Sequence, residues 1–206
     1  VCPGKISRSM TDPRQYEIGS LGLSGSQYTV EQTGTDKNFQ PEYEARDVTG
    51  DTIFRCTHNM YEGNDSFPFV DTDGTELFTV EARGSWDIAG DYLLTDSKTG
   101  EDLVVLDNDF SLFQDTWRIR DAEDESILAE ITSRGGFYTV GRKLLPVGQW
   151  IGHKFTIRDE EGKSVGTIES GFAVFDQYEI TISDTSSVPT DPVVAGTVVI
   201  DAIQEN

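Results

Sequence analysis

The chain repeats one pattern of apolar and polar positions five times. Each copy is an apolar run interleaved with polar residues, then an aspartate, a short turn that usually ends in glycine, and a second apolar run. This arrangement is typical of a β-hairpin, because successive side chains of a strand point to opposite faces of the sheet. The copies begin at Tyr43, Phe67, Asp91, Trp117 and Lys154 and read YEARDVTGDTIF, FPFVDTDGTELFTV, DYLLTDSKTGEDLVVL, WRIRDAEDESILAEI and KFTIRDEEGKSVGTI.

The aspartates that begin the turns set a regular period. Asp47, Asp71, Asp96 and Asp121 follow one another at intervals of 24, 25 and 25 residues, Asp159 comes after 38, and Asp184 after a further 25. Further strands are predicted at YTVEQ near residue 30 and at FAVFDQ and YEITISD near the end. The total of about twelve strands is close to what one closed antiparallel sheet of this length uses.

The tail TDPVVAGTVVIDAIQEN, residues 190–206, predicts a helix over 192–204, with Asp191 at the N-cap and Pro192 in the first helical position. This helix is apolar on all sides, so it must be buried. Its apolar run is far shorter than the ~20 residues that span a bilayer. We therefore predict a mainly β protein, a closed antiparallel barrel around a hydrophobic C-terminal central helix. We expect residues 15–206 to form this single domain and residues 1–14 to be a flexible leader.

The charge of the chain changes the expected environment. It has 37 acidic and 16 basic side chains and a formal net charge of −21. Molar salt screens such self-repulsion, so we predict a halophilic protein, while an acidic partner-binding surface stays open as an alternative. The acids are spread singly and 36% of the residues are hydrophobic, which argues against disorder. Nucleic acid is disfavoured as a partner.

Segments that would target the chain to a membrane or a compartment are missing from the sequence. The first fifteen residues contain no hydrophobic core of the kind a signal peptide needs, and no apolar run is long enough to span. We predict a cytoplasmic protein that can lie peripheral to the membrane. The two thiols, Cys2 and Cys56, provide neither a zinc cluster nor a disulfide framework.

Motifs for catalysis are also missing. His58 and His153 lie about 95 positions apart outside any ligand-spaced motif, so each is expected on the surface or in a strand with its hydrogen bonds satisfied. No serine sits in a GxSxG elbow, and the glycines of GSLGLSG lack the spacing of a phosphate loop. A triad assembled from distant residues would leave no such motif. We predict no catalytic residue, no metal, no cofactor and no enzyme activity.

Four further segments carry a family resemblance. QYEIGSLGLSGSQYTV, DIAGDYLLTD, DNDFSLFQDTW and SSVPTDPVVAGTVVIDAIQ, together with the hairpin series, resemble the haloarchaeal branch of the LURP-one-related proteins over residues 15–204. The resemblance implies the Tubby C-terminal-like fold, a twelve-stranded barrel around a central hydrophobic helix that the phospholipid scramblases share. It implies the fold better than the function, because the role of the family is largely uncharacterised and a fold alone confers none.

One stretch stands out against the acidic background. Ile131–Arg158, the acid-free segment, has no Asp or Glu in 28 residues, and it contains the interval of 38. It mixes basic with aromatic and aliphatic residues, which suits an anionic amphiphile such as a phospholipid headgroup. The alternative is a strand pair that closes one barrel end with its apolar residues buried. The predicted ligand-binding residues are Arg142, Lys143, Trp150, His153 and Lys154.

Two functions remain open from the sequence. The first is a non-catalytic module that binds a lipid or another anionic amphiphile, or a membrane surface, at the acid-free segment, by analogy with the tubby and scramblase relatives. The second is a protein-interaction or structural scaffold barrel that docks a partner subunit there. The sequence does not set the oligomeric state.

Overall fold

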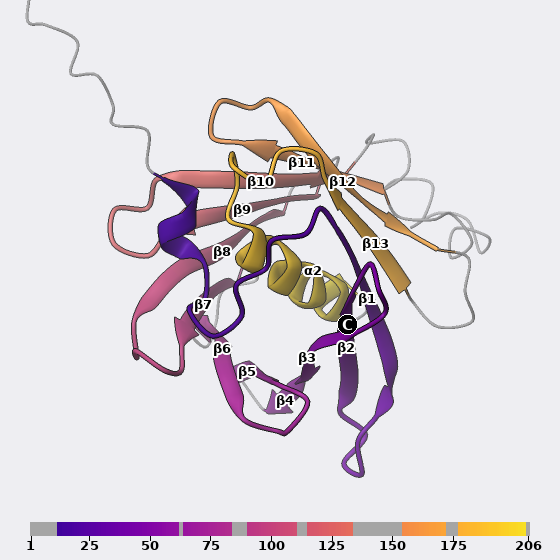
Figure 1. The fold of residues 1–206 in the computed structure, drawn as a ribbon. Helices are drawn as coiled ribbons and strands as arrows, with labels where there is room; N and C mark the ends of the chain where they lie inside the picture. Colours follow the sequence, from indigo (N-terminus) through magenta and orange to yellow (C-terminus); the bar gives the residue numbers. More distant parts are fainter. Residues whose placement is uncertain are drawn as a thin grey trace, which may run out of the picture.

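The computed structural model describes residues 12–61, 64–83, 90–110, 115–133, 154–171 and 177–204. These segments form a β-barrel with one helix through its middle (Figure 1). The strands are β1 (Gln27–Thr35), β2 (Pro41–Asp47), β3 (Thr52–Thr57), β4 (Asn59–Tyr61), β5 (Asn64–Val70), β6 (Glu76–Arg83), β7 (Asp91–Asp96), β8 (Asp102–Phe110), β9 (Asp115–Asp121), β10 (Ile127–Ser133), β11 (Lys154–Asp159), β12 (Ser164–Ser170) and β13 (Gln177–Ile182). The helices are η1 (Pro13–Tyr16), a 3-10 turn, and α2 (Thr190–Gln204).

The barrel is an antiparallel meander that closes on itself. β1 pairs with both β2 and β13, and β3 pairs with β5 to complete the ring. Twelve of the thirteen strands belong to the ring, since the short β4 pairs only with β5 among the described residues. This architecture confirms the mainly β, closed barrel of about twelve strands and its C-terminal helix.

All five hairpins predicted from the repeat are formed, and their aspartates explain the repeat. In each turn, one carboxylate oxygen of the aspartate accepts the backbone N–H two residues ahead at 2.6–3.1 Å. An aspartate in this position stabilises a turn through its own side chain. Three of the turns place glycine fourth, at φ values of 79 to 88 that other residues rarely adopt. The recurrent Asp and Gly are therefore turn residues.

The meander gives the barrel two different ends. The five turns 47–51, 71–75, 96–101, 121–126 and 159–163 all lie at the end where α2 begins, and they contain 13 acidic and 2 basic residues. We call this the acidic end. The segment before β1 also lies there, since the Tyr16 hydroxyl donates to Asp121 and the Gly19 N–H donates to Asp96. β10 ends and β11 begins at the opposite end of the barrel.

The helix α2 fills the centre of the barrel. Its residues 193–202 are all buried, and at its start Glu17, which comes from the segment before β1, accepts the N–H groups of Thr190 and Asp191. The helix thus begins two residues before the predicted 192. The predicted N-cap role of Asp191 is wrong, because its carboxylate turns outward to accept N–H groups of Ile18 and Leu23. The helix is capped by a carboxylate from a distant segment.

The remaining interior is packed with aromatic and aliphatic side chains. Phe69 stacks on Phe78 with ring centroids 4.2 Å apart, and Phe54 meets Phe69 edge to face at 5.1 Å. Such offset and edge contacts are the favoured arrangements of buried rings. In the described part of the barrel, core side chains and α2 occupy the interior. No helix in this part has both the length and the apolar character needed to cross a bilayer.

Candidate functional site

The structure describes one of the five residues predicted to bind a ligand. Arg142, Lys143, Trp150 and His153 lie outside the described residues, in the connection between β10 and β11. Lys154 is the first residue of β11, and its side chain is 55% exposed. Its Nζ atom lies 2.9 Å from the carboxylate of Glu169 on β12, so part of its charge is already balanced. An exposed pair of this kind contributes little free energy, so a ligand anion can compete for Lys154.

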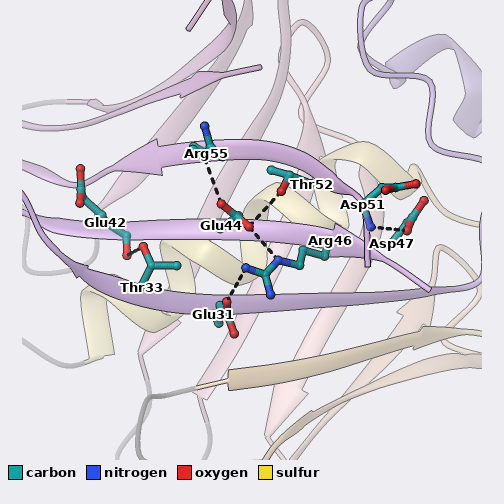
Figure 2. Close-up of polar contacts among 9 residues, drawn as sticks. All are labelled: Glu31, Thr33, Glu42, Glu44, Arg46, Asp47, Asp51, Thr52 and Arg55. Atoms are coloured by element: carbon teal, nitrogen blue, oxygen red, sulfur yellow. Dashed lines mark hydrogen bonds and ion pairs between the residues drawn. The ribbon is translucent and has the colours of Figure 1, made fainter. Parts of the chain in front are cut away.

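A cluster of paired charges covers the outer face of β1, β2 and β3 (Figure 2). Glu44 lies at its centre. One of its carboxylate oxygens accepts from Arg46 Nε at 2.7 Å and from Thr52 Oγ1 at 3.0 Å, and the other accepts from Arg55 Nε at 3.0 Å. Arg46 also reaches Glu31 on β1, at 3.1 Å. We call these five residues the Glu44 cluster.

Strand alternation and register bring the Glu44 cluster together. Tyr43 and Ala45 face the core, so Glu44 and Arg46 face outward from the same strand. Glu44 is opposite Arg55 in the register of β2 with β3, where oppositely charged cross-strand pairs stabilise a sheet. Burial alone would raise the pKa of Glu44, but hydrogen bonds from Arg55, Arg46 and Thr52 outweigh it and lower that pKa. An ionised, fully paired carboxylate is a structural group and a poor proton donor.

An open groove of ≈ 480 Å³ lies beside this cluster, between the turn 47–51 and the strands β1 and β13. Its lining is mostly polar, with hydroxyl and amide side chains, the carboxylates of Asp47 and Glu179, and a single guanidinium from Arg46. The carboxylates of Glu31 and Glu44 balance that guanidinium. The groove can offer hydrogen bonds to a small polar molecule, but its one cation is already paired.

His58 differs from its expected place. The side chain is fully buried between β3 and β4, stacked on Phe67 with ring centroids 4.4 Å apart, and neither ring nitrogen makes a hydrogen bond. Nε2 lies 3.4 Å from a carboxylate oxygen of Asp65. Burial lowers the pKa of His58, and the charge of Asp65 opposes that shift only in part. The expectation of a surface or satisfied histidine is therefore wrong, because a neutral imidazole packs here as an aromatic core side chain.

The described part of the chain offers neither a metal site nor a reactive thiol. There, no group of three or more His, Cys, Asp or Glu side chains is placed to hold a metal ion. Cys56 on β3 is buried, and burial raises the pKa of its thiol well above the usual value. A thiol that stays protonated in an apolar site is inert, so Cys56 is a packing residue.

A pair of carboxyl groups lies where α2 begins. Glu17 accepts the N–H groups of Thr190 and Asp191, both at 2.8 Å, and Asp191 accepts those of Ile18 at 2.9 Å and Leu23 at 3.0 Å. Burial, and then the charge of Asp191, raise the pKa of Glu17 to about 8. Carboxyl pairs that share a proton occur in acid–base catalysis. Here all four oxygens accept backbone N–H groups, so the pair joins two segments and leaves no oxygen directed at a substrate.

Comparison with known families gives one match. The family model described as LURP-one-related matches residues 52–201, which is 150 of the 206 residues. The matched region runs from β3 into the last turns of α2, so it includes eleven of the thirteen strands and the buried part of the helix. No curated protein matches the chain in a sequence comparison.

Proposed function

The chain belongs to the LURP-one-related family, and we propose that it is a non-catalytic β-barrel module that binds a lipid or another anionic amphiphile at the acid-free segment. Neither the family nor the fold assigns a ligand, so the proposal rests on how charge is distributed over the barrel.

The difference between the two barrel ends is the observation that carries this proposal. The five turns of the acidic end contain 13 acidic and 2 basic residues, and an anionic ligand would be repelled there. The acid-free segment connects β10 to β11, which end and begin at the opposite end. Lys154 is exposed there, and Arg142, Lys143, Trp150 and His153 belong to the connection itself. An anionic headgroup is therefore expected to approach the barrel from this end.

The packed interior restricts where a ligand can bind. Lipid carriers built on barrels hold their ligand in the lumen, whereas α2 and the core side chains occupy the described interior of this barrel. A ligand that binds without unfolding the core must therefore contact the rim or the outer wall. At a rim, basic residues bind the headgroup while aromatic residues contact the acyl boundary.

Vesicle flotation in buffered KCl tests the proposal. We expect the wild-type protein to float with vesicles of phosphatidylglycerol and phosphatidylcholine, and to float less with phosphatidylcholine alone. The double substitution Arg142→Glu and Lys143→Glu should abolish the difference between the two vesicles. The matched control is Lys98→Glu with Lys163→Glu, which changes the net charge equally but at the acidic end. Equal loss in both double variants would show that net charge alone decides binding, and would refute a site at the acid-free segment.

The scaffold alternative predicts a different result from the same proteins. A barrel that docks a partner subunit through this segment should not float with either vesicle. If that partner is a second copy of the chain, light scattering should show an oligomer that Arg142→Glu with Lys143→Glu dissociates. That pattern would replace lipid binding with subunit docking as the function of the segment.

A further inference from the structure

Phe39 at the tip of the β1–β2 hairpin is, we propose, an apolar anchor that enters the headgroup and acyl boundary of a lipid surface. This inference rests on the proposed lipid binding and deepens it, because it adds an uncharged contact from a different part of the chain.

The turn Asp36–Gln40 has the same geometry as three glycine-containing turns of the barrel. Asp36 N–H donates to the Gln40 carbonyl at 2.8 Å, and Phe39 N–H donates to the Asp36 carbonyl at 3.0 Å. The same two hydrogen bonds close the turns that begin at Asp47, Asp71 and Asp159. In those three turns, the fourth residue is Gly50, Gly74 or Gly162. Phe39 is the fourth residue of this one, at φ 63.

Phe39 has two features that are unfavourable or without benefit in this fold. A left-handed backbone is strained for a residue with a Cβ atom, and glycine avoids this strain. In addition, the side chain is 83% exposed, so it gains almost nothing from burial in this fold. The needs of folding explain neither feature, since glycine makes the same hydrogen bonds in the turns that begin at Asp47, Asp71 and Asp159. A strained residue that the fold does not need is a candidate for a functional contact.

The surroundings of Phe39 suit a membrane interface. Lys37 shares the turn, and the only acid of the turn, Asp36, accepts the N–H groups of Asn38 and Gln40. Met60 on β4 is partly exposed, and its N–H donates to the Gln40 side chain at 2.7 Å, which places a second apolar residue beside the turn. A phenyl ring beside an ammonium group can enter the acyl boundary while the cation stays at the phosphates.

The tip of the β1–β2 hairpin projects beyond the part of β1 that pairs with β13, at the barrel end opposite the acidic end. The last register pair of β1 with β13 joins Glu31 to Gln177, and β1 continues to Thr35 before the turn. At ~3.3 Å per residue, the tip extends roughly 13 Å past that pair. The β1–β2 hairpin runs out to the lower edge of the view in Figure 1. It points to the barrel end at which β10 ends and β11 begins.

In molar salt, an apolar contact between the protein and a lipid surface is retained better than a purely electrostatic contact. At molar ionic strength the Debye length is ~3 Å, so basic residues attract a headgroup only at direct contact. Burial of apolar area is not weakened in this way, and an apolar anchor would retain the protein on a surface when charges are screened. A projecting ring needs no complementary pocket in a bilayer, whereas a protein partner would have to supply one.

Vesicle flotation combined with thermal melting tests this inference. The probe is vesicles of phosphatidylglycerol and phosphatidylcholine in 2 M KCl, with wild type, Phe39→Gly and Phe39→Trp. We expect Phe39→Gly to bind roughly tenfold more weakly, about 1.4 kcal/mol, while its melting temperature is unchanged or higher. Phe39→Trp should bind at least as well as wild type. The matched control is Val48→Ser, which removes a side chain 72% exposed in a turn of the acidic end and should not change binding.

The outcomes separate this inference from the proposed function. If wild type floats and Phe39→Gly floats equally well, the anchor is refuted while lipid binding stands. If wild type does not float, both fail. If Phe39→Gly lowers the melting temperature along with binding, Phe39 is a structural residue and the anchor is refuted. A loss of self-association without a change in flotation would refute it too, and would assign Phe39 to a contact between copies of the chain.

Discussion

The carboxyl groups of Glu17 and Asp191, which are 174 residues apart in the sequence, each accept backbone N–H groups from the segment that carries the other. The segment before β1 is thereby joined to the start of α2, and it supplies the cap that the helix sequence does not. Burial, and then the charge of Asp191, disfavour ionisation of Glu17 and raise its pKa to about 8.

Stability should therefore fall as the pH rises from mildly acidic to mildly alkaline. Folding raises the pKa of Glu17 from 4.5 to about 8, so the folded state binds this proton more tightly than the unfolded state. That contribution is fully present below pH 4.5 and is lost as the pH rises through about 8. We expect the melting temperature, followed by circular dichroism, to decrease steadily between about pH 5 and 9.

The control for this pH dependence is Glu17→Gln, which cannot titrate. Its melting temperature should be nearly constant over the same range, even if it is lower at every pH. A variant with the wild-type slope would show that other groups cause the decrease. Acidification below pH ~4 tests different groups, because hydrogen bonds lower the pKa values of Asp47 and Asp184 and their contribution is lost there.

Gly166 on β12 is the second test, because the barrel wall has no room for a side chain there. A Cβ atom at this position would lie 2.4 Å from the carbonyl oxygen of Thr181 and 3.0 Å from Ile157. We expect Gly166→Ala to lower the free energy of unfolding by about 1–3 kcal/mol, the usual cost of overpacking. Gly171→Ala is the matched control, since its Cβ would meet only an ordinary contact at 3.8 Å. Equal denaturant midpoints for the two variants would contradict the packing of β12 against β13.

The sequence predicts the hairpins and the helix of this fold well, because residues that are close together in the chain specify each of them. An aspartate followed by a glycine specifies a turn whatever lies elsewhere, and an apolar run without a polar face specifies burial. The cap of α2 is not local, since the pattern predicts Asp191 as the cap, whereas Glu17 accepts the N–H groups at the start of the helix. Nothing near Glu17 in the sequence signals a partner at the other end of the chain.

The candidate sites were harder to predict for the same reason. The Glu44 cluster depends on the register of three strands, and the alternation in YEARD shows only that Glu44 and Arg46 share a face. His58 has a polar side chain, and its burial against Phe67 depends on contacts that only the folded chain brings together. Phe39 had one local signal, since it occupies the glycine position of a D-x-x-G turn. Comparison of the turns with one another would have found it.

Glu44 provides the third test. Glu44→Ala should lower the free energy of unfolding by about 1–2 kcal/mol, because Arg46 and Arg55 lose the carboxylate that accepts their hydrogen bonds. The loss is limited, since both guanidinium groups can turn to water. Glu42→Ala, on the same outward face of β2, should cost less than half as much. A double-mutant cycle of Glu44 with Arg55 should show coupling, and additive effects would remove the cluster as a unit of stability.

Salt dependence is the fourth test. The five turns of the acidic end carry a net charge of −11 (13 acidic minus 2 basic residues), so screening should stabilise the fold. We expect the melting temperature to rise steeply from about 0.1 to 3 M KCl. Glu123→Gln, Glu160→Gln and Glu161→Gln together should raise the melting temperature in low salt and flatten its dependence on KCl. A wild-type melting temperature indifferent to KCl would refute the halophilic prediction.

The last test concerns the helix at the centre of the barrel. Val193, Val194, Val198, Val199 and Ile200 are each at most 4% exposed. Burial of a large aliphatic side chain contributes roughly 1.5–3 kcal/mol, so these five contribute roughly 7–15 kcal/mol before costs. That is as large as the net stability of a typical domain, about 5–15 kcal/mol. The barrel should therefore not fold without α2.

Two variants measure this dependence. A chain that ends at Asp191 should be aggregated or molten by circular dichroism, even in molar KCl. Val198→Asp should behave almost as badly, because a buried carboxylate without a partner must be desolvated or protonated. Val48→Asp is the matched control, the same substitution at a side chain 72% exposed, and should melt close to wild type. A cooperative, native-like transition in the truncated chain would mean that the strands alone keep the barrel closed, and that α2 is not required for folding.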